Sequence, residues 1–211
     1  MKILGIDTST ENCSIALVEN CKVLIHKSVI GKSVHAEMIT ELLYEVKKSG
    51  INFDELDGIA VTNGPGSYTG LRIGLSFAKG MAIVINKPIL PVPTFSSLYH
   101  RVKDEVDEYT ILFIRSYSNY VFYVKAGDEN NLFDKKPDVD SVESLVEKFQ
   151  EVKRFIGNYP FNLDNKEVLV RYPDSVDTAI LGCLYFDKLK ALYSFELEPY
   201  YFSEFKAVKW K

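Results

Sequence analysis

Two short polar segments of this 211-residue sequence carry the side chains whose types and spacing could do chemistry. Asp7-Thr8-Ser9 follows a short apolar run. In a phosphotransferase, such a turn offers hydroxyl and amide groups to phosphate while the aspartate holds a metal ion through water. Asn63-Gly64-Pro65-Gly66-Ser67 precedes a long apolar segment, where glycines bring backbone amides close to an anion. The first hypothesis is therefore a phosphate-binding site made of Asp7, Thr8, Ser9, Gly64, Gly66 and Ser67.

The same two segments also have a structural interpretation. Asp7, Thr8 and Ser9 are of the residue types that bond to their own backbone in a tight turn. Ser67 or Thr69 is placed to cap a helix that begins close behind it. The glycine segment matches neither the nucleotide-binding loop that ends in Lys-Ser/Thr nor the dinucleotide fingerprint. Spacing alone favours structural turns over a phosphate site and leaves both interpretations open.

Other arrangements that could support catalysis are incomplete. Besides His26 and His100, the sequence has His35 at the start of a predicted helix, and Ile39 stands where a second helical metal ligand would be needed. No nucleophile-elbow motif is present. The aromatic residues at 109–123 and 195–210 are interleaved with few lysines or arginines. We therefore expect them to pack in the core and sheets rather than stack on bases.

Composition and charge limit the class of protein. The chain is 46% hydrophobic and 26% charged, with a net charge of -4 and a pI of about 5.5. These values are ordinary for a soluble globular protein and leave no global basic field to attract nucleic acid. A strand follows Met1-Lys2 directly, so we expect no signal peptide, and no run reaches the roughly 20 apolar residues of a membrane span. We expect a cytoplasmic protein without membrane contact.

The cysteines Cys13, Cys21 and Cys183 show no metal-like pair spacing, and their number is odd. They therefore predict neither a metal site nor a disulfide framework.

Hydrophobic periodicity predicts the elements that position these segments. Period-two runs between polar turns predict three strands close enough in sequence to form an antiparallel meander, and runs of period 3.6 predict helices. The expected order is strands at 3–8, 13–18 and 22–28, a helix at 34–48, a strand at 58–62, a helix at 71–85, a strand at 89–92 and a helix capped by Thr94.

The second half repeats this order less regularly. We expect a hairpin at 110–114 and 120–126, a third strand at 130–135, a helix that begins at Asp140 with Glu143 as its capping-box partner, and a short strand at 155–156. A final helix is expected at 176–192, with Asp174 or Ser175 immediately before its first turn. Residues 199–202 are expected to form a last strand or extended arm. The pattern predicts a duplication, with one domain at 1–106 and a second at 107–211.

The helix at 71–85 is apolar nearly all round. Its polar residues form one narrow stripe, and its small residues form another. The polar stripe is Arg72, Ser76 and Lys79, and the small-residue stripe is Gly70, Gly74, Ala78 and Ala82. A helix of this kind lies deep in a core or awaits a partner, and small residues permit close approach of a second helix.

Three stretches of the sequence resemble one protein family. They are ILGIDTSTENCSIALVEN from residue 3, VTNGPGSYTGLRIGLSFAKGMA from residue 61 and VPTFSSL from residue 92, and they are similar to segments of the TsaB (YeaZ) family. The resemblance implies the α/β fold of the actin-like ATPase superfamily. Such a fold has two similar, ribonuclease-H-like halves, each a mixed sheet with helices packed on it, here with the second half reduced. Pro199-Tyr200-Tyr201 is similar to the family's C-terminal Pro-Val-Tyr element.

The resemblance implies an accessory subunit of a tRNA threonylcarbamoyltransferase complex rather than an enzyme. TsaB proteins serve the synthesis of N6-threonylcarbamoyladenosine next to the anticodon of tRNAs. The implied partners are a TsaD-like subunit in a heterodimer and a TsaE-like ATPase in the larger complex. We expect the chain to meet tRNA only indirectly and to form a homodimer when alone, because its apolar helix face would otherwise be exposed. ATP and magnesium are used by the partner subunits, and no cofactor is expected on this chain.

Departures from the family pattern imply a degenerate member. The family hairpin Asp-Ala-Arg-x-Gly-Glu-Val-Tyr is replaced by RSYSNYVF from Arg115 to Phe122. The catalytic relative TsaD carries a His-x-x-x-His metal pair where this chain has His35 and Ile39. No counterpart of the Asp-Gly-Gly phosphate turn of active actin-like ATPases follows residue 110. We therefore expect no catalytic residue and no metal site, and the phosphate loop described above is expected to be vestigial.

The partner surface is expected on the helices at 34–48 and 71–85, because the family pairs through helices of the N-terminal half. The residues assigned to it are Val34, Met38, Leu42, Gly70, Leu71, Gly74, Leu75, Ala78, Met81 and Ala82.

Two rival functions stay open. A nucleotide-dependent phosphotransferase or ATPase of the actin-like superfamily would use the two polar turns as its phosphate site. A glycoprotease-like peptidase is the weaker rival, because no metal pair or nucleophile motif supports it.

Overall fold

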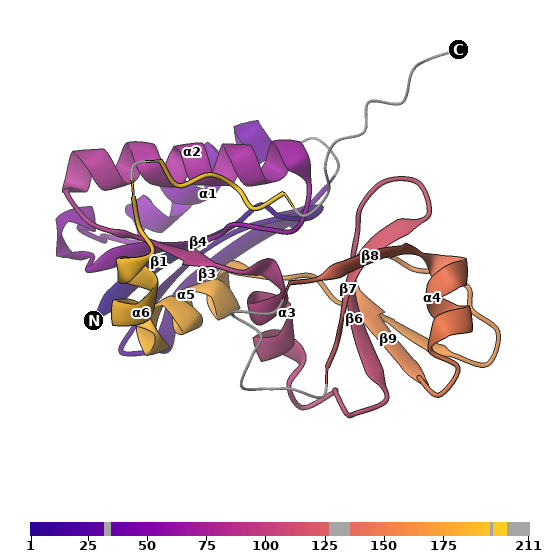
Figure 1. Ribbon diagram of the computed structural model, residues 1–211. Coiled ribbons are helices and arrows are strands. Elements are labelled where there is room, and N and C mark those ends of the chain that lie inside the picture. The colour runs from indigo at the N-terminus through magenta and orange to yellow at the C-terminus, as the bar shows by residue number, and fades with distance from the viewer. Residues whose placement is uncertain (32–34, 127–135, 195, 202–211) are drawn as a thin grey trace, which may run out of the picture.

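The computed structural model describes residues 1–31, 35–126, 136–194 and 196–201, and it shows two lobes side by side (Figure 1). The first lobe is built on a five-stranded sheet in the order β3-β2-β1-β4-β5. Its strands are β1 (Lys2–Asp7), β2 (Asn12–Glu19), β3 (Lys22–Ile30), β4 (Gly58–Thr62) and β5 (Ile89–Val92). The first three form the predicted antiparallel meander, and β4 and β5 run parallel to β1. The carboxyl ends of these three parallel strands therefore share one edge.

Helices cover both faces of this sheet. α1 (His35–Lys48) and α2 (Tyr68–Ile85) lie on one face, and α5 (Ser175–Leu184) and α6 (Phe186–Ala191) lie on the other (Figure 1). Each helix pair buries apolar side chains against its own side of the sheet. The predicted helices at 34–48 and 71–85 are confirmed, although residue 34 lies outside the described residues. A short 3-10 turn at Phe53–Glu55 was not predicted.

The second lobe repeats the sheet of the first. Its strands are β6 (Thr110–Arg115), β7 (Tyr120–Lys125), β8 (Asp138–Ser141), β9 (Arg154–Gly157) and β10 (Glu167–Val170), in the order β10-β9-β6-β7-β8. β6 takes the place of β1 and β9 the place of β4, so both sheets have the same topology. α4 (Val142–Lys148) covers one face, and α3 (Thr94–Val102) covers the other.

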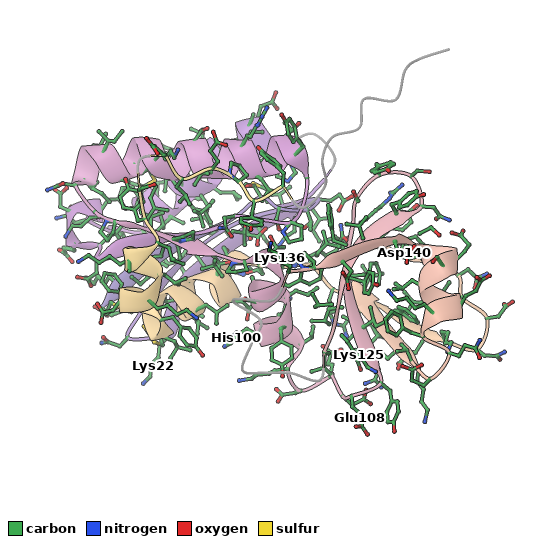
Figure 2. All side chains as sticks on the ribbon, in the orientation of Figure 1. Lys22, His100, Glu108, Lys125, Lys136 and Asp140 are labelled. Carbon is green, nitrogen blue, oxygen red and sulfur yellow. A yellow bond between two sulfur atoms is a disulfide. The ribbon has the colours of Figure 1, made fainter. Side chains whose placement is uncertain are left out.

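The second lobe is the reduced copy. β4 and β5 are connected through α2, whereas residues 158–166 connect β9 with β10 without a helix. The predicted fold of two similar α/β halves, the second reduced, is confirmed. Charged side chains such as Lys22, Glu108 and Lys125 lie on the outside of the lobes (Figure 2). None of the described helices is long and apolar enough to span a membrane.

Helices are exchanged between the two halves of the chain. α5 packs so closely on the first sheet that a Cβ on Gly5 would lie 2.2 Å from the carbonyl oxygen of Ser175. A Cβ on Gly182 would lie 2.7 Å from the Cβ of Ala60. α3 crosses in the other direction and packs on the second sheet. A division at residue 106 therefore separates the two sheets but not the helices that cover them.

Several helix ends differ from the prediction for local reasons. Ser67 caps α2, as predicted, because its hydroxyl accepts a bond from the amide of Gly70 at 3.2 Å. Thr94 is not a cap but the first residue of α3, which follows Pro93. α4 is capped by Ser141 and not by Asp140, because the Ser141 hydroxyl accepts a bond from the helix's third residue. The single helix predicted at 176–192 is interrupted at Tyr185, between α5 and α6.

Cys21 and Cys183 form a disulfide, so the prediction of no disulfide is wrong. The bond ties the turn between β2 and β3 to the end of α5, 162 residues further along the chain. Sequence spacing does not indicate such a pair, because this turn and this helix meet only when α5 returns to the first sheet. Cys13 is a buried free thiol.

Candidate functional sites

The two polar turns singled out in the sequence meet at the carboxyl edge of the first sheet. The amide of Ser67 donates to the carbonyl of Ser9 at 2.7 Å, and the hydroxyl of Thr8 donates to the carbonyl of Gly70 at 2.7 Å. A Cβ on Gly66 would lie 2.3 Å from the carbonyl oxygen of Ser9. Gly66 therefore permits backbone contact within the chain, and the Ser67 amide, which a phosphate would need, is already bonded.

The C-terminal segment covers the same loop. The amide of Tyr200 donates to the carbonyl of Asn63 at 2.6 Å, and a Cβ on Gly64 would lie 2.5 Å from the carbonyl oxygen of Tyr200. Gly64 also has a φ of +124°, which L side chains rarely adopt. The backbone conformation and the closeness of Tyr200 thus explain why position 64 is a glycine, without any bound anion.

Asp7 is fully buried at the end of β1. Its Oδ1 accepts hydrogen bonds from the amide and hydroxyl of Ser9 at 2.9 and 2.8 Å, whereas Oδ2 has no partner among the described residues. Burial raises the pKa of this carboxyl group to about 7, because lost hydration outweighs the bonds from Ser9, and the charge of Asp174 adds to the rise. Near neutral pH, Asp7 is therefore partly protonated.

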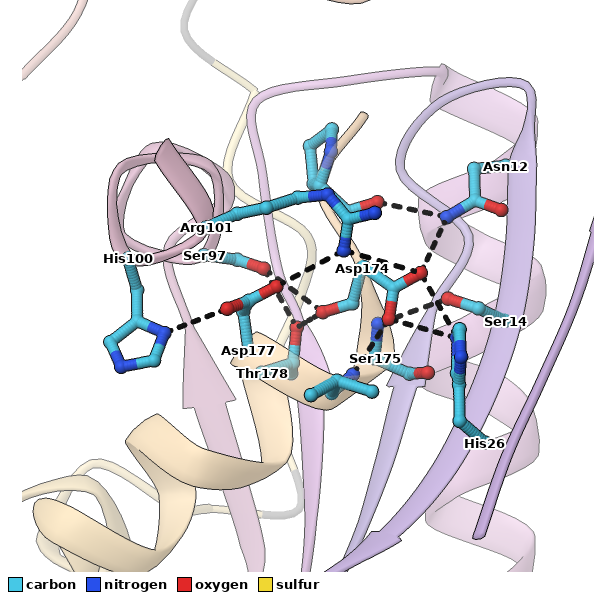
Figure 3. Close-up of polar contacts among 12 residues, drawn as sticks. Asn12, Ser14, His26, Ser97, His100, Arg101, Asp174, Ser175, Asp177 and Thr178 are labelled. Atoms are coloured by element: carbon cyan, nitrogen blue, oxygen red, sulfur yellow. Dashed lines mark hydrogen bonds and ion pairs between the residues drawn. The ribbon is translucent and has the colours of Figure 1, made fainter. Parts of the chain in front are cut away.

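A second polar cluster lies around the first turn of α5 (Figure 3). Asp174 caps the helix through the amide of Val176 at 2.9 Å and accepts a bond from the Asn12 side chain at 3.1 Å. Nε2 of His26 lies 3.0 Å from Oδ1 of Asp174. Burial acts to raise the pKa of Asp174, but the bonds from His26 and Val176 and the nearby charges of His26 and Arg101 lower it overall. Asp174 is thus a buried carboxylate held in its charged form.

The cluster extends from α5 to α3. Asp177, on the first turn of α5, lies 2.7 Å from Nδ1 of His100 and 3.4 Å from Nη1 of Arg101, and the hydroxyl of Ser97 donates to the carbonyl of Asp174 at 3.2 Å (Figure 3). These bonds join β2, β3, α3 and α5, so the cluster fixes the exchanged helix α5 in place. Its members lie up to 162 residues apart in sequence, and only the capping role of Asp174 could be predicted.

His35 has a structural partner. Its Nε2 lies 2.6 Å from the carbonyl oxygen of Thr10, which ties the start of α1 to the turn after β1. Ile39, four residues further along, is 2% exposed in the core. Within the described part of the chain, no group of three His, Cys, Asp or Glu residues is arranged to hold a metal ion.

Most residues assigned to the partner surface face the chain's own sheet. The buried ones are Leu42, Gly70, Leu71, Gly74, Leu75, Ala78 and Ala82, whereas Met38 and Met81 are half-buried and Val34 lies outside the described residues. A Cβ on Gly74 would lie 2.2 Å from the hydroxyl oxygen of Thr8. The small residues therefore let α2 approach the turn after β1, and a partner at this helix would meet other side chains.

A different row of α2 residues is accessible. Ile73, Phe77 and Met81 are half-buried at intervals of four residues, and Val84, three residues further, is 83% exposed. This spacing places the four residues on one side of the helix, and we call them the α2 ridge. A contiguous row of large, partly covered apolar side chains is typical of a protein-binding surface.

The hairpin between β6 and β7 differs from the expectation. The aromatic residues at 109–123 were predicted to pack in the core and sheets, and Tyr123 is buried there. Tyr117 is exposed, and it stacks on Tyr120, the exposed first residue of β7, with the ring centroids 5.1 Å apart. Arg115 lies 3.9 Å from the ring centroid of Tyr159, and its amide donates to the Asn158 side chain at 2.7 Å. The segment that departs from the family hairpin therefore forms its own contacts within the second lobe.

Known proteins of one family match this chain. A family model for TsaD, described as tRNA N6-adenosine threonylcarbamoyltransferase, matches residues 30–171, which is more than half of the chain. The tRNA N6-adenosine threonylcarbamoyltransferase of Fervidobacterium nodosum is 31% identical over 181 residues, which cover 76% of this chain and 52% of that protein. The tRNA threonylcarbamoyladenosine biosynthesis protein TsaB of Escherichia coli is 34% identical over 99 residues, which cover 46% of this chain and 42% of that protein.

The matches span about half the length of these curated relatives. A solved structure from Pseudomonas aeruginosa, described as a protein with similarity to peptidase YEAZ, matches with a TM-score of 0.75 and 20% identity. The match covers 96% of this chain and 99% of that one. At this identity the match shows the fold alone, and it agrees with the two lobes described above.

Proposed function

We propose a function from one premise: this chain belongs to the family that contains TsaD and TsaB (YeaZ) proteins. Its role is that of a non-catalytic partner subunit in the formation of N6-threonylcarbamoyladenosine next to the anticodon of tRNAs. A TsaD-type partner transfers the threonylcarbamoyl group, and a TsaE-type ATPase joins the larger complex. tRNA is met through the partner, and the chain forms a homodimer when alone.

The observation that carries the partner role is the α2 ridge of Ile73, Phe77, Met81 and Val84. α1 lies beside α2 on the same face of the first sheet, so both helices offer their outer sides to one partner (Figure 1). Two adjacent helices can supply the roughly 800 Å² per partner that a stable complex buries. The residues assigned to the surface therefore shift from the small-residue stripe to the ridge.

Three features support a role without chemistry of its own. Asp7 is fully buried, and its Oδ1 already accepts the amide and hydroxyl of Ser9. Gly64 is covered by the backbone of Tyr200. His35 bonds to the carbonyl of Thr10, and the core residue Ile39 stands where the catalytic relatives have a second histidine.

Co-elution with the TsaD-type protein of the same organism on a size-exclusion column tests the proposal. Met81→Glu/Val84→Glu places two charges on the ridge, and we expect the complex to be lost because these charges would be buried without partners. Leu184→Glu/Leu192→Glu is the matched control, since it adds the same charges to exposed leucines at the end of α5 and directly after α6, the helices on the opposite face. Equal co-elution of both variants, or no co-elution of the wild type, would contradict the proposal.

A further inference from the structure

The C-terminal segment 197–201, which we call the strap, runs along the flank of α2 (Figure 1). The strap and the polar stripe of Arg72, Ser76 and Lys79 line a groove of about 130 Å³. Leu197 packs against the core beneath α2. The polar stripe therefore lies beside a segment of the same chain, while Arg72 at its start stays exposed and the ridge is the apolar side of the helix.

At the start of α2, the strap holds Arg72 between two tyrosines. Nε of Arg72 donates to the hydroxyl of Tyr201 at 2.9 Å, and the guanidinium carbon lies 3.8 Å from the ring centroid of Tyr68. The two rings are 4.9 Å apart, and Tyr68 is 48% and Tyr201 38% exposed. A stacked guanidinium with one fixed hydrogen bond keeps a defined orientation at the surface.

This cluster leaves one side of Arg72 for a further partner. Among the described residues, none bonds to Nη1 or Nη2, since the bond to Tyr201 uses Nε. Nη1 and Nη2 form a planar pair of donors that matches the two oxygens of a carboxylate. Tyrosine and arginine are also the residue types enriched among the anchors of protein interfaces.

The cluster lies at the start of α2, beside the α2 ridge. Arg72 and Ile73 are consecutive helix residues and lie about 100° apart around the helix axis, so a partner must span the outer side of α2 to contact both. The neighbouring helix α1 exposes Glu37, Glu41 and Glu45 at intervals of four residues. Glu198 of the strap also lines this groove and, besides the bond to Tyr201, its charge contributes to the raised pKa of Arg72 without a bond to Nη1 or Nη2. A partner lying along the ridge meets the cation of Arg72 beside the strap and carboxylates on α1, so its own carboxylate is favoured at Arg72.

We propose that Arg72, held by Tyr68 and Tyr201, binds a carboxylate of the TsaD-type partner, and that the strap is therefore part of the interface. This inference rests on the proposed function and adds the chemistry that the partner must present. Segments far apart in sequence contribute to the contact, because Tyr201 orients an arginine that comes 129 residues earlier.

Calorimetric titration of the full chain with its TsaD-type partner tests this inference. Arg72→Gln removes the charge, and Arg115→Gln is the matched control, because Arg115 lies over Tyr159 at 3.9 Å in the second lobe. We expect Arg72→Gln to raise Kd about tenfold or more and to weaken the salt dependence of Kd. Arg115→Gln should stay within about twofold of the wild type. Tyr201→Phe, which keeps the ring and removes the hydroxyl, should raise Kd by about two- to fivefold.

An Arg72→Gln variant that binds within about twofold of the wild type would overturn the inference. If Arg72→Gln lowers Tm and is not a clean probe, Tyr201→Phe decides, and an unchanged Kd overturns the inference in the same way. Failure of the proposed function gives a different result from failure of this inference, because the wild-type chain itself would then not bind the TsaD-type partner. Loss of binding in Met81→Glu/Val84→Glu with normal binding in Arg72→Gln would leave the ridge in place and remove the strap from the interface.

Discussion

The carboxyl group of Asp7 lies at the buried end of β1, where it gains two bonds from Ser9 and loses its hydration. Its pKa is raised from 3.8 to about 7, so the folded protein keeps a proton that the unfolded chain releases at much lower pH. The contribution of this group to stability is therefore greatest below pH about 3.8. It falls as pH rises and becomes level above pH about 7.

Asp7→Asn should remove this pH dependence of stability, because the side-chain amide keeps an oxygen acceptor for Ser9 and carries no charge. Urea unfolding at pH 5 and pH 8 measures the free energy of unfolding of both proteins. From pH 5 to pH 8, the free energy of unfolding of the variant should rise relative to that of the wild type by on the order of a few kcal/mol. The exposed Asp164→Asn should show no such gain. A difference between Asp7→Asn and the wild type that is the same at both pH values would show that Asp7 is ionised in the folded state.

At the scale of single residues, the sequence predicted which side chains gather at the sheet edge but not their state. Asp7, Ser9, Gly66 and Ser67 do meet, as the strand ends require. Burial of Asp7 and the cover over Gly64 depend on α5 and on Tyr200, which come from the far end of the chain. The pattern of residues near Asp7 or Gly64 in the sequence cannot indicate contacts with segments so far along the chain.

The helix α2 presents three different sides. Gly70 and Gly74 face the turn after β1, and Ala78 and Ala82 pack in the core of the first lobe. The polar stripe faces the strap, and the ridge is partly exposed. The near absence of polar residues therefore reflects burial on two sides as well as an apolar surface on the third. Small residues served here for packing within the chain, which periodicity alone does not distinguish from packing against a partner.

Two glycines of α2 provide a matched test of this arrangement. A Cβ on Gly70 would lie 2.1 Å from the backbone oxygen of Thr8, whereas no atom lies within 4 Å of a Cβ on Gly80. Gly70→Ala should destabilise the fold by about 1–3 kcal/mol through overpacking. Gly80→Ala should stabilise it by about 0.5–1 kcal/mol through helix propensity. Equal effects in urea unfolding would mean that α2 does not approach the turn as described.

Element prediction succeeded where the signal was local. The strands and helices of the first half follow hydrophobic periodicity, and the structure confirms them with small shifts at their ends. β8 and β10 were missed because they are short and partly exposed. β8 reads Asp-Val-Asp-Ser, and it is a strand because it pairs with β7. The predicted strand at 130–135 lies outside the described residues.

At the scale of the whole molecule, the duplication was predictable and the exchange of helices was not. The order of strands recurs in each half of the sequence, and the two sheets share one topology. The return of α5 to the first sheet depends on bonds among Asn12, His26, Asp174 and Arg101, whose positions in sequence give no sign of contact. The same return brings Cys183 to Cys21.

The central claim is that this chain supports tRNA modification by binding and not by chemistry of its own. Reconstituted formation of N6-threonylcarbamoyladenosine with the TsaD-type and TsaE-type proteins of the same organism tests it most directly. We expect Asp7→Asn to support the wild-type rate, whereas Met81→Glu/Val84→Glu should lower the rate about tenfold or more. A rate abolished by Asp7→Asn, or unchanged by the ridge variant, would contradict it.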